Sequence, residues 1–180
     1  MQETISTPLT ERLGCRYPII SAGMGGPARA ELAAAVSSAG GFGQLGMVRE
    51  SPELIESEIA AVKRLTNRPF SVNLIPGATD PKLLDDELAA CFRAGVSALC
   101  FFWGVDAKAI ARAKQAGCLV LYQVGSVADA KLAEDAGADV IIVQGIEAGG
   151  HVKDRRGLSV LVPDVADAVK LPIAASGGPT

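Results

Sequence analysis

The sequence predicts an α/β fold in which parallel strands alternate with helices, and two patterns in the 180-residue chain support this. Short apolar runs recur along it and are hydrophobic throughout rather than alternating, which is typical of parallel strands covered on both faces. The dipeptide Ala-Gly stands just ahead of four of these runs, at residues 39–40, 94–95, 116–117 and 136–137. Glycine suits the position after a helix because it adopts the left-handed conformation without steric cost. The repeat therefore marks four junctions between a helix and the next strand.

Seven strands are expected from the apolar runs, separated by segments of helical character. They cover residues 19–22, 42–45, 70–74, 98–102, 119–123, 140–144 and 173–176. Ser51 and Asp80 are each followed by proline and are expected to cap the start of a helix. Asp106 and Asp164 are further expected N-caps.

The succession of βα units favours a (β/α)8 barrel, the TIM barrel, over an open Rossmann sheet. A Rossmann sheet would carry a GxGxxG turn after its first strand, whereas residues 23–26 read Gly-Met-Gly-Gly without the third glycine in register. A closed barrel needs eight strands and typically about 250 residues. We therefore expect a single domain over residues 1–180, a TIM barrel truncated after the seventh strand.

The composition argues against several classes of partner. The net charge of −3 provides no basic surface for nucleic acid. No stretch approaches the roughly 20 apolar residues of a membrane span, and the N-terminus shows no apolar signal region. The cysteines form no CxxC pair, and a single histidine is present, so no metal site is expected. These features favour a cytoplasmic protein that acts on a small molecule, and they leave self-association open.

In a barrel of this kind the active site lies at the C-terminal ends of the strands, so polar residues there are candidates. Asn73, Gln123 and Gln144 each end an apolar run. An amide buried there without a partner costs about 1–3 kcal/mol. Three amides around one barrel mouth suggest a planar ligand with a donor–acceptor edge, such as a flavin pyrimidine ring. Water or neighbouring loops are the alternative partners.

His151 is the only histidine and follows Gly149-Gly150 beyond the sixth strand. Imidazole titrates near neutral pH, which suits proton transfer or hydrogen bonding to a developing anion. A purely structural role is the alternative. Gly149-Gly150 and Gly177-Gly178 could expose backbone N–H groups to a phosphate, or simply form tight turns.

Two further residues near the strand ends have open roles. Glu147 could act as a second acid or base or be structural, and Trp103 could wall the cleft or pack in the core.

Six stretches together resemble one family. They are PIISAGMGG (18–26), SAGGFGQLG (38–46), RPFSVNL (68–74), VLYQVGSV (120–127), VQGIEAGGH (143–151) and LPIAASGG (171–178). In this order they resemble the nitronate monooxygenase family, formerly called 2-nitropropane dioxygenase. The stretch VQGIEAGGH is the most specific of the six.

The resemblance implies an FMN-dependent barrel in which His151 matches the active-site histidine. It implies that the cofactor-binding residues are Ala22, Gly23, Met24, Asn73, Gln123, Gln144, Gly149, Gly150, Ser176, Gly177 and Gly178. In the family an eighth strand and a helical segment that covers the substrate follow, and both are expected to be absent here.

The implied reaction is oxidation of an alkyl nitronate by O2 to a carbonyl compound and nitrite. His151 would orient the nitro group or deprotonate a neutral nitroalkane. Two alternatives remain. One is an NAD(P)H-dependent quinone or enoyl reductase of the same flavin barrel, with which the polar residues 152–157 are compatible. The other is a non-catalytic remnant whose unpaired strand edges seek a partner.

Overall fold

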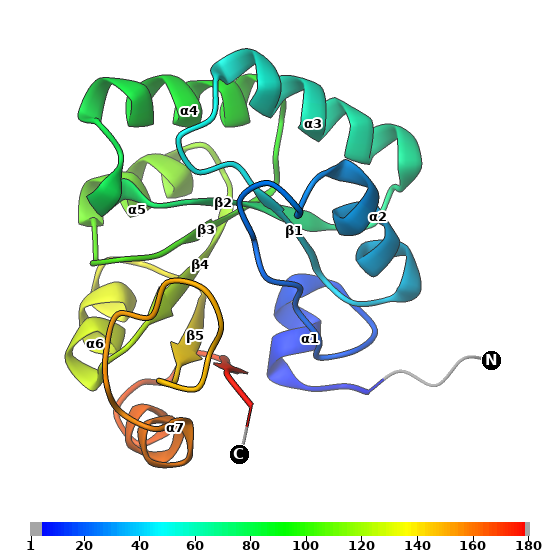
Figure 1. The fold of residues 1–180 in the computed structure, drawn as a ribbon. Coiled ribbons are helices and arrows are strands. Elements are labelled where there is room, and N and C mark those ends of the chain that lie inside the picture. Colours follow the sequence, from blue (N-terminus) through cyan, green and yellow to red (C-terminus); the bar gives the residue numbers. More distant parts are fainter. Residues whose placement is uncertain (1–4, 179–180) are drawn as a thin grey trace.

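Within residues 5–178, six parallel strands form one curved sheet in the order β1-β2-β3-β4-β5-β6, with helices along its outer face (Figure 1). The structure is a computed structural model that describes residues 5–178. The strands are β1 (Gly43–Gly46), β2 (Phe70–Leu74), β3 (Ala98–Phe101), β4 (Leu119–Val124), β5 (Val140–Gln144) and β6 (Ile173–Ser176). The helices are α1 (Pro8–Leu13), α2 (Ala30–Ala39), α3 (Pro52–Leu65), η1 (Pro76–Ala78), α4 (Pro81–Arg93), α5 (Ala107–Gln115), α6 (Val127–Asp135) and α7 (Leu158–Ala166).

The sheet confirms the predicted barrel-type α/β fold, in the form of a half-barrel. Each strand pairs in parallel with the next, and the six observed strands match predicted ones to within one residue at each end. Among the described residues β6 pairs with β5 alone, so the sheet stays open on that side. The register brings Gly46 beside Asn73 and Gln144 beside Ser176, which aligns the C-terminal ends of neighbouring strands.

The prediction of a strand at residues 19–22 is wrong, because this segment forms only an isolated parallel bridge between Ile20 and Phe42. The N–H of Phe42 donates to the Ile19 carbonyl at 2.8 Å, and the N–H of Ser21 donates to the Phe42 carbonyl at 3.0 Å. The ladder then stops because the N–H of Gln44 donates to the Ser21 hydroxyl instead of a backbone carbonyl. The predicted count of seven strands is therefore corrected to six strands and one isolated bridge in the part of the chain that the structure describes.

The local signals at the helix ends are confirmed with one exception. Ser51, Asp80 and Asp106 accept hydrogen bonds from the first turns of α3, α4 and α5. All four Ala-Gly glycines have positive φ, as the left-handed position after a helix requires. Asp164 is not an N-cap: it lies inside α7 and forms an ion pair with Arg156.

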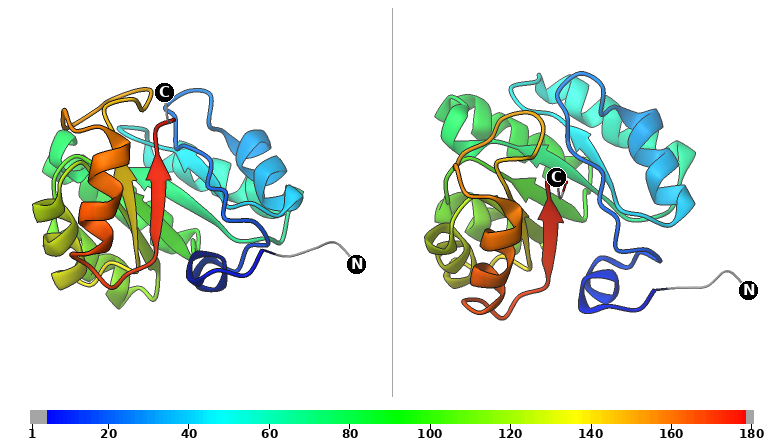
Figure 2. Two further views of the ribbon diagram at one scale, coloured as in Figure 1. Left: turned by 90° about the horizontal axis from the view of Figure 1, so that it is seen from below. Right: turned by 60° about the horizontal axis from the view of Figure 1, so that its bottom comes forward.

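The two ends of the strands differ in character. At the N-terminal end α1 covers the inside of the sheet, and Leu9 and Leu13 pack with Phe42, Leu121 and Val140 (Figure 2). At the other end lie the segment before α2 and the segment before α7, blue and orange in Figure 2. The outer face of the sheet packs against the helices in a larger apolar cluster.

Asp139 ties α1 and α5 to the N-terminal end of the sheet. Its carboxylate, 2% exposed, accepts from Lys114 Nζ at 2.7 Å and from the Val120 N–H at 2.8 Å, and pairs with Arg12. Burial disfavours its ionised form, but the hydrogen bonds from Lys114, Val120 and Arg12 outweigh this and lower its pKa.

Candidate active site

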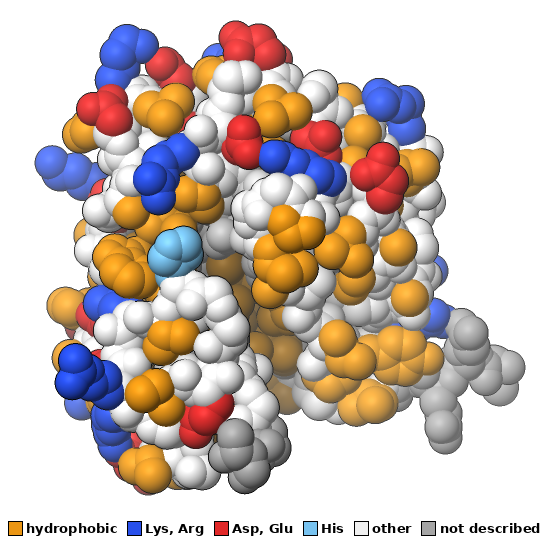
Figure 3. All heavy atoms as spheres, viewed as in Figure 1, with side chains coloured by type: hydrophobic (Ala, Val, Ile, Leu, Met, Phe, Trp, Pro, Cys, Tyr) orange, Lys and Arg blue, Asp and Glu red, His pale blue; other side chains and the backbone are white. Residues whose placement is uncertain are grey.

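The C-terminal ends of the strands surround a cavity of about 480 Å³, within the usual range for small-molecule sites. Figure 3 shows this face, with the histidine side chain in pale blue at the rim of a hollow. Nine of the predicted site residues line this cavity: Ala22, Gly23, Met24, Asn73, Gln123, Gln144, Gly149, Gly150 and His151. They come from segments up to about 130 positions apart in the chain, so the fold gathers them as the barrel argument requires.

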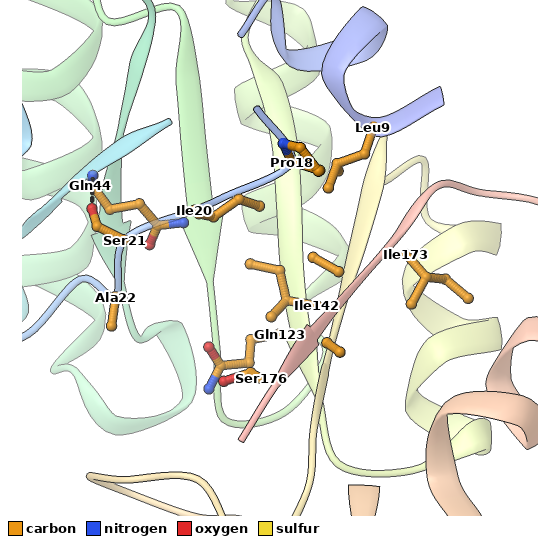
Figure 4. Close-up of a pocket in the computed structure, with 12 residues that line it drawn as sticks. Leu9, Pro18, Ile20, Ser21, Ala22, Gln44, Gln123, Ile142, Ile173 and Ser176 are labelled. Carbon is orange, nitrogen blue, oxygen red and sulfur yellow. Dashed lines mark hydrogen bonds between the residues drawn. The ribbon is translucent and has the colours of Figure 1, made fainter. Parts of the chain in front are cut away.

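A second cavity of about 240 Å³ lies against the inner face of the half-barrel (Figure 4). It shares Ala22, Gln44 and Gln123 with the first, so the two are neighbours. Ser176 lines this smaller cavity. Of the remaining predicted cofactor residues, Gly177 and Gly178 line neither cavity.

The three strand-end amides differ in their partners. Asn73 Nδ2 donates to the Gly23 carbonyl at 3.0 Å, which leaves its oxygen for a ligand. Gln144 Nε2 donates to the His151 carbonyl at 2.9 Å, and its oxygen accepts from the Lys153 N–H at 3.4 Å. The Gln123 side chain has no hydrogen-bond partner within residues 5–178. Gln144 thus secures the backbone that carries His151, while Gln123 presents a free amide to both cavities.

His151 presents an exposed imidazole at the cavity. Its ring meets Trp103 edge to face, with ring centroids 6.1 Å apart and planes at 88°. Trp103 is 38% exposed and has a φ of 78°, a conformation that is uncommon and strained for a bulky residue. Trp103 is therefore not packed in the core, but it does not line either cavity; it contacts the ring of His151 from outside the cavity.

Glu147 has a structural role. Its two carboxylate oxygens accept from the N–H of Leu158, at 3.1 and 3.0 Å, and so satisfy a free donor at the start of α7. Gly145 makes room for this contact, because a Cβ there would lie 2.4 Å from a Glu147 oxygen.

Six residues that line the cavity are not among the predicted site residues: Gly25, Gln44, Val48, Arg49, Ile75 and Phe102. Gln44 carried a usable signal, because it is a polar residue inside an apolar strand. The others carried none, since a loop residue reaches a site only through the path of its loop.

No metal site is visible in the described part of the chain, which holds no group of three His, Cys, Asp or Glu residues able to bind a metal ion. Burial raises the pKa values of the Cys91 and Cys100 thiols to about 12, so neither is a ready nucleophile. None of the helices in residues 5–178 is long and apolar enough to span a membrane.

The cavity fits a flavin in three respects. A Cβ added at Gly149 or Gly150 would meet no atom within 4 Å, so the backbone there is open to a ligand. Gln123 offers an unpaired donor and acceptor, and Asn73 a free acceptor, as the edge of a planar heterocycle would require. The lining of the cavity also includes the apolar Met24, against which a ring can pack.

The fold and this cavity fit the class of flavin-binding barrels, and comparison with known proteins shows the family. The nitronate monooxygenase family model matches residues 6–180. A "probable nitronate monooxygenase" of Staphylococcus saprophyticus is 31% identical over 217 residues, covering 97% of this chain and 61% of that protein. The chain belongs to the nitronate monooxygenase family, whose members are flavin-dependent oxidoreductases.

Other relatives carry different activities. A (3aS,4S,5R,7aS)-5-hydroxy-7a-methyl-1-oxo-octahydro-1H-indene-4-carboxyl-CoA dehydrogenase of Rhodococcus jostii is 37% identical over 175 residues. The match covers 97% of this chain and 48% of the dehydrogenase, so the chain spans about half that protein's length. The structure of FabK from Thermotoga maritima superposes with a TM-score of 0.89 at 35% identity, covering 96% of this chain and 54% of that one. A nitroalkane oxidase from Streptomyces ansochromogenes superposes with a TM-score of 0.83 at 30% identity, covering 94% and 60%.

Proposed function

We propose that the protein binds FMN and oxidises alkyl nitronates with O2 to carbonyl compounds and nitrite. The observation that carries this proposal is the single cavity in which His151, the free Gln123 amide and the open Gly149-Gly150 backbone meet. In the balanced reaction each O2 oxidises a pair of nitronate ions to a pair of carbonyl compounds and a pair of nitrite ions.

The chain's own residues would hold the cofactor and orient the substrate. Gln123 and Asn73 would hydrogen-bond the polar edge of the flavin, and the backbone at Gly149-Gly150 would receive its phosphate-bearing chain. The predicted contacts from Ser176 and Gly177-Gly178 belong to the same proposal. The chemistry that the bound flavin supplies is electron transfer from the nitronate to O2.

His151 would handle the proton and the nitro group. Its main chain is held by Gln144, and its ring stands against Trp103, so the imidazole is placed at the cavity before substrate arrives. A ring nitrogen would donate a hydrogen bond to a nitronate oxygen. With a neutral nitroalkane, the same nitrogen would first accept the proton from the carbon next to the nitro group.

Oxygen uptake and nitrite release with propionate 3-nitronate and with an alkyl nitronate test the proposal. We expect His151→Ala to lower turnover by about 10²–10⁴-fold, the usual contribution of a positioned acid or base, while the bound flavin spectrum stays unchanged. Lys131→Gln, an exposed change on α6, serves as the control. Full activity in His151→Ala would refute the assigned role, and a protein that carries flavin but consumes no oxygen with any nitronate would refute the reaction.

A second candidate is a reductase or dehydrogenase that acts on a thioester-linked acyl group. It is favoured by the 37% identity to the Rhodococcus CoA dehydrogenase and by the similarity to FabK. Anaerobic mixing with NADH separates the two functions, because rapid bleaching of the flavin absorbance favours the reductase and no reaction favours nitronate oxidation.

A further inference from the structure

Arg49 is a basic residue of the cavity that the proposed chemistry does not use. It lies in the loop between β1 and α3, and its side chain is exposed. Among the described residues that line the cavity it is the only one with a permanent charge, and no carboxylate lines the cavity with it. An anion that enters the cavity therefore meets one full positive charge and no full negative charge.

Arg49 acts on the buried Glu87 at longer range, where its charge favours the ionised carboxylate, but it forms no direct ion pair in residues 5–178. Its guanidinium has no hydrogen bond in that part of the chain either. The adjacent acid, Glu50, is already engaged, because its carboxylate accepts from Arg29 at 2.6 Å. Lys153, on the opposite loop, is likewise paired, at 2.5 Å from Asp129. Arg49 thus differs from Arg29 and Lys153 in making no direct contact with a carboxylate among the described residues.

The loop holds Arg49 in a constrained backbone conformation. Its φ of 59° lies in the left-handed region, which is sterically unfavourable for a residue other than glycine. The loop is fixed on both sides, since the N–H of Met47 donates to the Asn73 carbonyl at 3.2 Å and that of Glu50 to the Met47 carbonyl at 3.4 Å. Strain of this kind persists where the surrounding structure enforces it and is common at ligand sites.

Arg49 also lies away from the expected position of the flavin phosphate. The glycines proposed for the phosphate follow β5 and β6, whereas Arg49 follows β1, the strand at the other end of the sheet (Figure 1). A cation at this place is therefore available to the substrate rather than to the phosphate of the cofactor.

We infer that Arg49 forms an anion subsite, which binds a carboxylate or phosphate that the substrate carries away from its reacting carbon. This inference rests on the proposed function for the position of the substrate, but not on the identity of the reaction. A guanidinium suits both groups because its planar donors match two anionic oxygens at once.

Calorimetric titration of the flavin-loaded protein tests the subsite without requiring turnover. Two pairs of probes differ mainly in charge. They are 3-nitropropionate against 1-nitropropane for a carboxylate, and 4′-phosphopantetheine against pantetheine for a phosphate. We expect the charged member of one pair to bind at least about tenfold more tightly, as a charge-assisted contact provides. The pair that shows the preference identifies the anionic group.

Arg49→Met should remove that preference, and Arg49→Lys should retain part of it. Arg155→Met, on the exposed loop after His151, should leave it unchanged. Equal binding of charged and neutral probes by the wild-type protein, or a preference that survives in Arg49→Met, would overturn the inference. A protein that turns over no nitronate but shows the Arg49-dependent preference supports the subsite, so the two proposals can fail separately.

Discussion

Replacing Glu87 by glutamine should make the protein more stable at pH 8 than the wild type and leave it nearly unchanged at pH 4. Glu87 lies on α4 and is 0% exposed, and neither carboxylate oxygen has a hydrogen-bond partner in the described residues. Burial raises its pKa from the usual 4.5 to about 7. The nearby backbone N–H groups of Arg49 and Glu50 favour the ionised carboxylate and partly oppose this rise, although neither forms a hydrogen bond of normal geometry with it.

The sign and size of the effect follow from the linkage between proton binding and folding. Because the pKa is raised in the folded state, Glu87 ionises more readily in the unfolded chain. The wild-type free energy of unfolding therefore falls as the pH rises from about 4.5 to about 7, and then levels off. The difference between these two pKa values corresponds to about 3 kcal/mol, since each tenfold change in proton affinity is about 1.4 kcal/mol. A neutral, isosteric glutamine avoids this loss.

Urea unfolding followed by circular dichroism at pH 4, 5, 6, 7 and 8 measures the prediction. The difference in free energy of unfolding between Glu87→Gln and the wild type should grow across this range, toward about 3 kcal/mol. Glu31→Gln, at an exposed position on α2, should show no such growth. Parallel pH profiles for Glu87→Gln and the wild type would refute the reasoning and would mean that Glu87 finds a partner for its charge in the folded state.

Two further predictions concern the ends of the strands. Asp139→Ala should destabilise the protein by about 1–3 kcal/mol at pH 7 in thermal or urea unfolding. It leaves the Val120 N–H without its acceptor, whereas Lys114 and Arg12 are partly exposed and become solvated. Because folding lowers the pKa of Asp139, its contribution to the free energy of unfolding is present above the pKa of the unfolded chain and is lost as the pH falls. The stabilities of Asp139→Ala and the wild type should therefore converge in acid. A difference that stays constant with pH would contradict the role of the ionised carboxylate. Gln144→Leu should cost about 1–3 kcal/mol and lower nitronate turnover more than flavin binding, because it frees the His151 main chain. An equal loss of flavin would indicate direct cofactor contact instead.

The sequence was sufficient for most of the fold because local chemistry decides where helices and strands begin and end. Helix caps and C-terminal glycines act on backbone only a few residues away in the chain. Examples are the caps Ser51, Asp80 and Asp106 and the glycines after four helices. Residues 19–22 could not be read this way. Their apolar run is strand-like, but the Ser21 hydroxyl takes the N–H of Gln44, a contact between segments that no local pattern records.

For the candidate site, too, some features could be predicted from the sequence and others could not. The strand-end position of Asn73, Gln123, Gln144 and His151 is determined by the sequence, because the C-terminal ends of parallel strands must meet on one side of a sheet. Which of these groups is free was decided by the tertiary structure: Gln144 holds the main chain of His151, and Gln123 is left unpaired.

The loop after β1 shows most clearly what could not be predicted from the sequence. Its sequence contains an ordinary exposed arginine and its neighbouring helix an ordinary glutamate. Only the folded chain buries Glu87 without a partner and sets Arg49 at the cavity in a left-handed conformation. Burial, charge compensation and the path of a loop depend on residues distant in the chain, so they arise only when the helices and strands pack together.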